Sequence, residues 1–424
     1  MNIILLFSLM FIFMTLSVPI GASLGFAALI IVGLASNIPA VMINQNAFAG
    51  LDSFPLMAIP FFMLAGNIMA AGGIARRLVN VCDLMVGKII GGVGMVTVAG
   101  CMFFSSMCGS GPATVSAMGT IMLPEMEKRG YDKDFATGLT ATAGTIGVIL
   151  PPSIPYVIYG VVASVSIGEL FIAGIVPGII IGFALMGVCY VISRKRGYKG
   201  TGSDNLKAWP VIKDSMLSMI TPVIILGGIY GGIFTPTEAA VIAVVYSLII
   251  GAFVHKELSW RSFLDAVRST ADLNGQTGFA IGFSMSFASY LAMEQIPSKA
   301  AALLLSYTTN DIVILCLILL FLLVIGLFID NISSCLILTP VFLPIVKSIG
   351  MSPVHFGIVM TIALSMGFVT PPYGANLFVA TAISGVSIER IAWAAIPFLV
   401  AMLTCLLLVT FAPVLSMGLV GLMK

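Results

Sequence analysis

Charged residues are scarce in this sequence. Asp, Glu, Lys and Arg make up 8% of the 424 residues, hydrophobic residues make up 59%, and the mean hydropathy is +1.15. A soluble domain needs far more polar material to cover its surface, so the composition predicts an integral membrane protein. Apolar runs such as 239–254 and 312–329 are continuous and long enough to cross a lipid bilayer as helices, whereas a β-barrel would show short alternating segments. The net charge of +2 gives no reason to expect a nucleic-acid partner.

The sequence also lacks the residues that catalysis and transition metals require. Its two histidines, His255 and His355, lie far apart, and its seven cysteines include no C-x-x-C pair. No HExxH or GxSxG motif occurs, and no pair of carboxylates lies within an apolar run. We therefore expect no enzyme activity, no cofactor and no transition metal.

The few Lys and Arg residues predict the topology, because cytoplasmic loops of membrane proteins carry an excess of both. The first apolar run has no basic flank and continues past Pro19, so we interpret it as a membrane helix and not as a signal peptide. With helices at 3–18, 20–37 and 54–71, the N-terminus lies in the periplasm and Arg76 in the cytoplasm. When the remaining crossings are assigned in the same way, only three basic residues lie on the periplasmic side: Lys299, Lys347 and Lys424.

Three short segments mix charged and apolar positions and are too polar to span the membrane: 74–87, 259–272 and 294–307. We expect each to form an interfacial amphipathic helix, or arm.

What the sequence does contain is an internal repeat of helix-breaking residues. A set of Pro, Gly and other residues recurs in the second half with unchanged spacing, inside sequence that is otherwise apolar. Helix breakers repeated at membrane depth are a strong sequence pointer to the binding site of a secondary transporter. The residues are Leu123, Pro124, Gly130, Ala143, Gly147, Pro151, Pro152, Ser164, Glu169 and Pro177, matched by Leu343, Pro344, Gly350, Ala363, Gly367, Pro371, Pro372, Ser384, Glu389 and Pro397.

Each repeat contains two predicted interruptions. The first is a re-entrant helical hairpin with its tip at 105–114 or 326–334, where small and polar residues favour a turn. The second is a broken membrane helix at the Pro-Pro pair, where proline removes backbone donors and leaves the carbonyls of 147–150 and 367–370 without intrahelical partners. An odd number of crossings separates the hairpins, so the two repeats are inverted relative to each other.

Unpaired carbonyls and hydroxyls together form an oxygen-only site that suits Na⁺ better than a transition metal. We expect a sodium site in each repeat and, between the hairpin tips, a substrate carboxylate that faces helix N-termini. The first predicted sodium site is Ser105, Ser106, Ser110, Thr142, Thr145, Gly147 and Leu150, and the second is Gly326, Asp330, Ser333, Ser365, Gly367 and Thr370. The predicted substrate-binding residues are Gly111, Pro112, Ala113, Thr114, Pro152, Ser153, Asn331, Ser334, Pro372, Tyr373 and Asn376.

Asp330 is the only charged residue between Asp311 and Lys347. A carboxylate near the bilayer centre costs at least about 2.5 kcal/mol, so Asp330 is expected to face the cavity or a cation. The alternative is that Asp330 caps the helix that starts at Asn331, which is compatible with a ligand role. The equivalent residue in the first repeat is Ser110, so the two hairpins differ chemically.

At these residues the chain resembles, over essentially its full length, the large membrane subunit of tripartite ATP-independent periplasmic (TRAP) transporters. The resemblance implies an ion-transporter superfamily fold in which a transport domain moves like an elevator against a scaffold, and Na⁺-driven uptake of an organic acid across the bacterial inner membrane. It also implies a soluble periplasmic substrate-binding protein and a separate small four-helix membrane subunit, since this chain starts directly at its first scaffold helix. The overall likeness is greatest to sialic acid importers. The matching motifs are Ser110 to Thr114, Ile149 to Ser153, Asp330 to Ser334 with Thr339-Pro340, and Thr370 to Gly374.

The predicted fold is therefore an all-α polytopic membrane protein with inverted repeats, two re-entrant hairpins and two broken transmembrane helices. The predicted function is Na⁺-coupled import of a small organic acid, with sialic acid favoured; a stand-alone Na⁺/dicarboxylate symporter of the same fold is the alternative. The predicted domains are scaffold helices with an arm (1–88), the first transport half (89–166), connecting and scaffold helices with arms (167–310), the second transport half (311–386) and a C-terminal helix (387–424).

Overall fold

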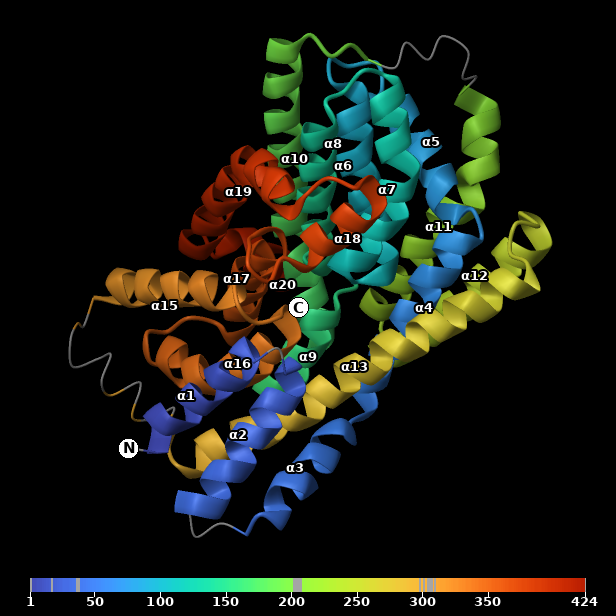
Figure 1. The fold of residues 1–424 in the computed structure, drawn as a ribbon. Coiled ribbons are helices and arrows are strands. Elements are labelled where there is room, and N and C mark those ends of the chain that lie inside the picture. Colours follow the sequence, from blue (N-terminus) through green and yellow to red (C-terminus); the bar gives the residue numbers. More distant parts are fainter. Residues whose placement is uncertain are drawn as a thin grey trace.

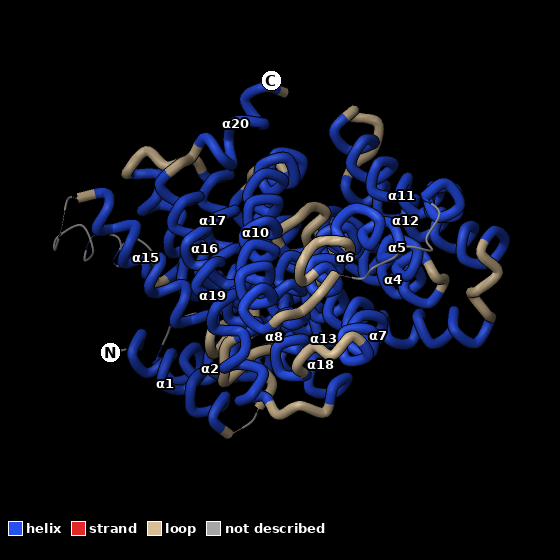
Figure 2. The backbone as a smooth tube through the Cα atoms, turned by 90° about the horizontal axis from the view of Figure 1, so that it is seen from above, coloured by secondary structure: helices blue, strands red, loops and turns tan. Residues whose placement is uncertain are grey.

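A computed structural model describes residues 2–16, 18–35, 39–200, 208–296, 299, 302, 308 and 310–423. Every regular element in these ranges is a helix, and none of these residues forms a strand (Figure 2). Six helices within these ranges are long and apolar enough to cross a membrane. The prediction of an all-helical fold with several membrane-spanning helices is therefore confirmed.

One group of helices, which we call the frame, is organised around the long helix α13 (Trp260–Met293). Helix α13 packs against α2, α3 and α4, and α12 packs against α4 (Figure 1). At Gly25 of α2, a Cβ atom would overlap the ring of Phe283 on α13, so glycine permits the close helix approach that stabilises packing in lipid. The other frame helices are α1 (Asn2–Thr15), α2 (Ile20–Ala35), α3 (Val41–Leu51), η1 (Phe54–Met57), α4 (Ala58–Ala71), α5 (Ile74–Val86), α11 (Ala208–Tyr230), α12 (Pro236–Ile249) and the π-helical turn η3 (Ile250–Val254).

The second group, which we call the hairpin bundle, contains both repeats. The first repeat supplies α6 (Gly92–Cys108), α7 (Gly111–Lys128), α8 (Lys133–Ala143), η2 (Gly144–Val148), α9 (Ile154–Ala163) and α10 (Ile167–Arg196). The second supplies α15 (Asp311–Gly326), α16 (Asn331–Ser348), α17 (Pro353–Met366), η4 (Gly367–Val369), α18 (Ala375–Ser384) and α19 (Ile388–Phe411), followed by α20 (Val414–Leu422). Helix α9 packs on α16 and α18 packs on α7, so each repeat places a short helix against the hairpin of the other.

Several repeated residues have the same structural role in both halves. Gly130 follows the end of α7 and Gly350 follows the end of α16, with φ of +76° and +75°, a left-handed conformation that glycine adopts without steric cost. Glu169 and Glu389 lie in the first turns of α10 and α19, where the helix dipole favours a negative charge. The sequence repeat is therefore also a repeat of local structure.

The single prolines of the repeat do not break helices. Pro124 and Pro177 lie inside α7 and α10, as Pro344 and Pro397 lie inside α16 and α19. One proline removes only one backbone donor, and the helix continues around it. Only the Pro-Pro pairs interrupt the helical path.

The structure differs from the predicted elements in three places. Helix α3 was not predicted. The predicted arm at 259–272 is the first part of α13, because no proline separates it from the following crossing and Ser259 caps the combined helix. The predicted C-terminal helix 387–424 is two helices, α19 and α20, with Pro413 between them. The predicted arm at 74–87 is helix α5, and most of the predicted arm at 294–307 lies outside the described residues.

Candidate substrate and cation site

The tip of the first hairpin is a two-residue turn. Gly109 has φ of +64° and ends α6, and its N–H donates to Ser105 O at 3.3 Å. Ser110 is extended and precedes α7, but its side chain makes no cap hydrogen bond. Pro112 has no N–H to donate. The N-terminus of α7 is therefore not capped by a side chain of its own segment.

The tip of the second hairpin is longer and is capped. Residues 327–330 connect α15 to α16, and Asp330 Oδ2 accepts a hydrogen bond from Ser333 N–H at 2.9 Å. Asp330 is half-buried. A carboxylate at an N-cap satisfies backbone donors and interacts favourably with the helix dipole, so part of its charge is already stabilised by α16.

Each hairpin tip contacts the broken helix of its own repeat. Ile154 N–H donates to Gly109 O at 3.2 Å, and Tyr373 N–H donates to Leu327 O at 3.0 Å. The Pro151–Pro152 and Pro371–Pro372 peptide bonds are both cis. The predicted breaks are present, because no helix covers the residues between η2 and α9 or between η4 and α18. The unwound backbone is partly paired with the hairpin beside it.

Two equivalent glycines make this contact possible. A Cβ atom at Gly147 would lie 2.6 Å from both Ser110 O and Thr114 Oγ1, and one at Gly367 would collide with the carbonyl of Gly326. Any larger residue at either position would push the hairpin away from the break.

Two of the carbonyls that the sequence analysis expected to lack partners are paired. Thr370 N–H donates to Gly367 O at 3.2 Å, and Ser153 Oγ donates to Val148 O at 2.5 Å. The prediction that these carbonyls lack intrahelical partners was wrong at Gly367, because a short 3₁₀ turn supplies a new helical bond. It holds at Val148, whose carbonyl is paired by a side-chain hydroxyl from outside the helix.

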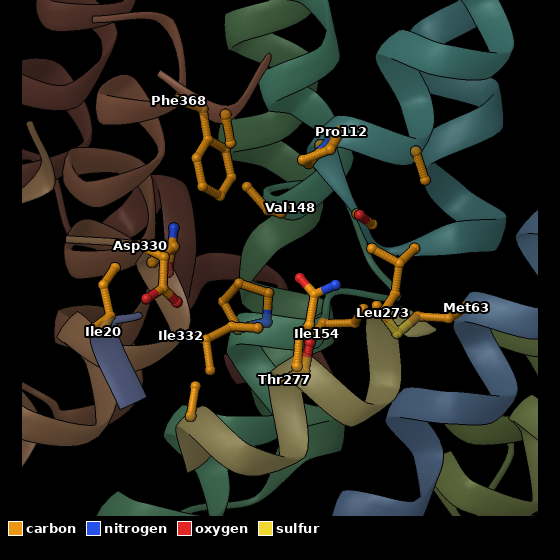
Figure 3. A pocket seen from close by; sticks show the side chains of 18 of the residues that line it. Ile20, Met63, Pro112, Val148, Ile154, Leu273, Thr277, Asp330, Ile332 and Phe368 are labelled. Atoms are coloured by element: carbon orange, nitrogen blue, oxygen red, sulfur yellow. The ribbon is translucent and has the colours of Figure 1, made fainter. Parts of the chain in front are cut away.

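A cavity of about 690 Å³ lies between the two tips (Figure 3). Pro112 from the first hairpin and Asp330 from the second both face it, and Thr277 of α13 closes another side (Figure 3). No Lys or Arg is among the described residues that line it, and Asp330 is the one acidic residue among them. An anion in this cavity therefore has no basic side chain to pair with.

Four of the five hydroxyls in the first predicted sodium site, all but that of Ser110, hydrogen-bond within their own segment. Ser106 Oγ donates to Phe103 O (2.6 Å), Thr142 Oγ1 to Gly138 O (2.8 Å), Thr145 Oγ1 to Thr142 O (2.7 Å) and Ser105 Oγ to Cys101 O. A hydroxyl that donates keeps lone pairs that can accept from a cation. Of this set, Ser110 lines the cavity, whereas Gly147 and Leu150 are buried.

The second predicted sodium site is divided in a similar way. Ser365 Oγ donates to Ile362 O (2.8 Å) and Thr370 Oγ1 to Met366 O (2.9 Å). Asp330 lines the cavity, and Ser333 is fully buried in the first turn of α16. Gly326 and Gly367 form the contact between hairpin and break.

The predicted substrate residues fall into two classes. The cavity is lined by Gly111, Pro112, Ala113, Asn331 and Tyr373. Thr114, Pro152, Ser153, Ser334, Pro372 and Asn376 do not line it. Asn376 instead connects the two halves, because its Nδ2 donates to Ala141 O of the first repeat at 2.9 Å.

Buried oxygen atoms without hydrogen-bond partners gather at the second hairpin. Asn331 Oδ1, Ser333 Oγ and Ser334 Oγ lie in the first turn of α16, and Asn331 Nδ2 reaches the backbone of Thr361, whose own Oγ1 is also unpaired. Asn376 Oδ1 is a further unpaired oxygen. Leaving a buried polar group unpaired costs about 1–3 kcal/mol of folding free energy. A cation coordinated by these oxygens would remove that cost. The donor set fits Na⁺.

Sequence reasoning missed the wall of the cavity that α13 provides. Gly275, Gln276 and Thr277 line the cavity, as do Ile20 of α2 and Met63 of α4. The signal in the sequence was the polar run from Asn274 to Gly278 inside an otherwise apolar crossing.

A family model described as tripartite ATP-independent periplasmic transporter, DctM component, matches residues 7–415. The isethionate TRAP transporter permease protein DctMQ of Oleidesulfovibrio alaskensis is 46% identical over 98% of this chain, which spans 66% of that relative's length. The C4-dicarboxylate TRAP transporter large permease protein DctM of Pseudomonas aeruginosa is 38% identical over 88% of this chain and 87% of its own. The sialic acid TRAP transporter large permease protein SiaM of Vibrio cholerae is 37% identical over 93% of both chains. All three are transport permeases and not enzymes.

Two solved structures share the fold. The YdaH transporter of Alcanivorax borkumensis has a TM-score of 0.65 and 16% identity, with 89% of this chain and 88% of that chain covered. MtrF of Neisseria gonorrhoeae has a TM-score of 0.60 and 12% identity, with 88% and 84% covered. At such identities the likeness concerns the arrangement of helices alone.

Proposed function

Because this chain belongs to the family of DctM components of tripartite ATP-independent periplasmic transporters, we propose that it imports a small organic acid by coupling its uptake to Na⁺. Large permeases of this family work with a small membrane subunit and a periplasmic binding protein, and we propose the same kinds of partner here. The proposed location is the bacterial inner membrane, with the N-terminus in the periplasm.

The observation that carries the proposal is the group of unpaired buried oxygens beside Asp330, at one end of a cavity whose described lining residues include no Lys or Arg. An organic anion that enters this cavity meets a carboxylate and no compensating cation from the protein. Na⁺ coordinated near Asn331 and Ser333 would supply that positive charge and satisfy the unpaired oxygens. A cation is therefore required for the anion to bind well.

This requirement provides the coupling. If bound Na⁺ strengthens binding of the acid, the acid strengthens binding of Na⁺ by the same factor, because coupling free energies are reciprocal. The acid group would lie at the uncapped N-terminus of α7, where the helix dipole favours negative charge. A second Na⁺ is proposed between the first hairpin tip and its broken helix.

For alternating access we propose an elevator movement of the hairpin bundle against the frame. The contacts that would have to slide include those of α6 with α4 and α5, and those of α16 with α13. The cavity lies at this boundary, with hairpin tips on one side and α2, α4 and α13 on the other.

Sialic acid is the substrate that we propose first, because a cavity of about 690 Å³ has room for a sugar acid and a relative that is 37% identical is named for sialic acid. Isethionate is the second candidate, since the relative that is 46% identical is named for it.

Reconstitution in proteoliposomes tests the proposal. The chain is combined with a small membrane subunit and a periplasmic binding protein from the same organism, and uptake of labelled sialic acid, isethionate and succinate is followed with and without an inward Na⁺ gradient. Uptake that requires Na⁺ and both partners supports the proposal. Equally fast uptake by the chain alone would instead support the stand-alone symporter, and uptake indifferent to Na⁺ would refute the coupling.

A further inference from the structure

The wall of the cavity that belongs to the frame is unusually polar for a membrane helix. The run Asn274-Gly275-Gln276-Thr277-Gly278 lies in the middle of α13, between the apolar residues Leu273 and Phe279. Gly275, Gln276 and Thr277 line the cavity. In Figure 3, Thr277 and Leu273 lie across the cavity from Pro112 and Phe368.

The two polar side chains have no hydrogen-bond partners in the part of the chain that the structure describes. Neither Gln276 nor Thr277 makes a side-chain hydrogen bond to any residue that the structure describes, and Gln276 is exposed to the cavity. Uncharged polar side chains at membrane depth are normally paired with neighbouring helices, as Ser286 of the same helix is with Ile43 O. Packing does not explain why Gln276 is polar.

Packing also does not explain the glycines on either side. A Cβ atom added at Gly275 or Gly278 would meet no atom within 4 Å, whereas one at Gly282, further along α13, would lie 3.2 Å from Leu51. Glycine in the middle of a helix lowers stability relative to alanine, so it usually has a packing reason. At Gly275 the result is open space beside Gln276.

We propose that Gln276 and Thr277 form a subsite that binds an uncharged hydroxyl or amide group of the substrate, at the end remote from its acid group. This inference rests on the proposed function, because it requires an organic acid in the cavity. The amide of Gln276 and the hydroxyl of Thr277 each both donate and accept, which matches a hydroxyl or amide and gives no preference for a second carboxylate. The subsite therefore selects acids that carry such a group over analogues that lack it.

Pairs of acids that differ by one hydroxyl test the subsite: isethionate against ethanesulfonate, malate against succinate, and N-acetylneuraminate against its 9-deoxy analogue. Binding to the purified full-length chain in Na⁺ is measured by calorimetry, so that the selectivity of a separate binding protein does not enter. We expect the wild type to bind the hydroxylated member of the pair it accepts about threefold to tenfold more tightly, as expected for one neutral hydrogen bond.

The variant Gln276→Leu should abolish this preference by weakening only the hydroxylated acid. Asn274→Leu is the matched control, because Asn274 is an amide on the same helix that does not line the cavity. A second comparison replaces the glycines. Gly275→Val fills the space beside Gln276 and should weaken both members of the pair, whereas Gly278→Val, at a position that does not line the cavity, should not.

A wild type that binds both members equally, a Gln276→Leu variant that keeps the preference, or an Asn274→Leu variant that loses it to the same extent would each overturn the inference. A wild type that binds none of these acids in a Na⁺-dependent manner would overturn the proposed function and the subsite with it.

Discussion

The two hairpins have the same backbone plan and different polar chemistry. Helix α7 starts after Ser110, whose side chain makes no cap bond, whereas α16 starts after Asp330, which accepts from Ser333 N–H. Around the first tip, the predicted ligand hydroxyls other than that of Ser110 donate to backbone carbonyls. Around the second, the oxygens of Asn331, Ser333 and Ser334 are buried without partners.

The surroundings of the breaks differ too. Pro151 and Pro152 are buried, whereas Pro371 and Pro372 are exposed. A repeat can thus keep the positions that shape the backbone, such as Gly147 and Gly367, while its polar residues diverge. We infer that the first tip presents a partly positive helix end to the acid group and that the second presents oxygens to a cation.

The largest effect is expected from Asp330→Asn, which removes the charge that distinguishes the second tip. Asparagine is as good an N-cap as aspartate, so α16 stays capped. If Asp330 acts only as a cap, Na⁺-driven uptake is unchanged. We expect instead that the Na⁺ concentration for half-maximal uptake rises about tenfold to a hundredfold, because an interaction with a charged group contributes about 1.5–3 kcal/mol. Asp311→Asn, in the first turn of α15, is the control.

The converse change, Ser110→Asp, places a carboxylate at the tip of the first hairpin, at the position equivalent to Asp330 in the second. The new side chain should cap α7, so the chain should be as stable as the wild type or more so. Its charge would repel the acid group, and we expect KM for the acid to rise at least about tenfold, since a like charge within a few ångströms costs over 1 kcal/mol. Ser110→Asn adds a cap without charge and should keep KM near the wild-type value. Unchanged KM in Ser110→Asp would mean that the acid group binds elsewhere.

The features of the site that the sequence predicted are those that depend on backbone chemistry. Pro-Pro pairs must interrupt a helix, and Asp330 in an apolar run must face something polar, so both breaks and the position of Asp330 at the cavity could be anticipated. The sequence did not reveal which carbonyls find new donors, because Ser153 Oγ reaches Val148 O only once the break has folded.

The wall contributed by α13 was missed for a different reason. Residues 259–272 are too polar to cross a membrane alone, which suggested a separate arm, but tertiary packing against α2, α3 and α4 supports one continuous helix. The polar run at Gln276 then lies opposite the hairpin tips. The contact between α13 and the hairpin tips joins segments that are far apart in the chain. Such contacts produce no periodic pattern in a single sequence, so they could not be predicted from it.

A smaller effect, on stability, is expected at Gly147 and Gly367, the two equivalent glycines that contact the hairpin tips. Gly367→Ala should destabilise the chain by about 1–3 kcal/mol, because the new methyl group collides with the rigid backbone of Gly326. Gly147→Ala should cost less, since one of its two close contacts, Thr114 Oγ1, can rotate away. Thermal unfolding of the purified variants measures the order. Gly187→Ala, where a Cβ meets nothing within 4 Å, is the control, and equal melting of all three would contradict the packing at both tips.

The smallest effect separates a paired hydroxyl from an unpaired one. Ser105 and Ser333 are both fully buried, but Ser105 Oγ donates to Cys101 O and Ser333 Oγ has no partner. In Na⁺-free buffer, Ser105→Ala should lose about 1 kcal/mol of stability. Ser333→Ala should be as stable as the wild type or more so, because it loses no hydrogen bond and removes a buried unpaired hydroxyl. Adding Na⁺ should stabilise the wild type more than Ser333→Ala. Ser247→Ala, which loses a bond to Val244 O in α12, should respond to Na⁺ as the wild type does. The contrary result is a Ser333→Ala variant that unfolds at a lower temperature than the wild type without Na⁺ and is stabilised by Na⁺ as much as the wild type. In that case the Ser333 hydroxyl makes a structural hydrogen bond and binds no Na⁺, and the two tips differ only in Asp330.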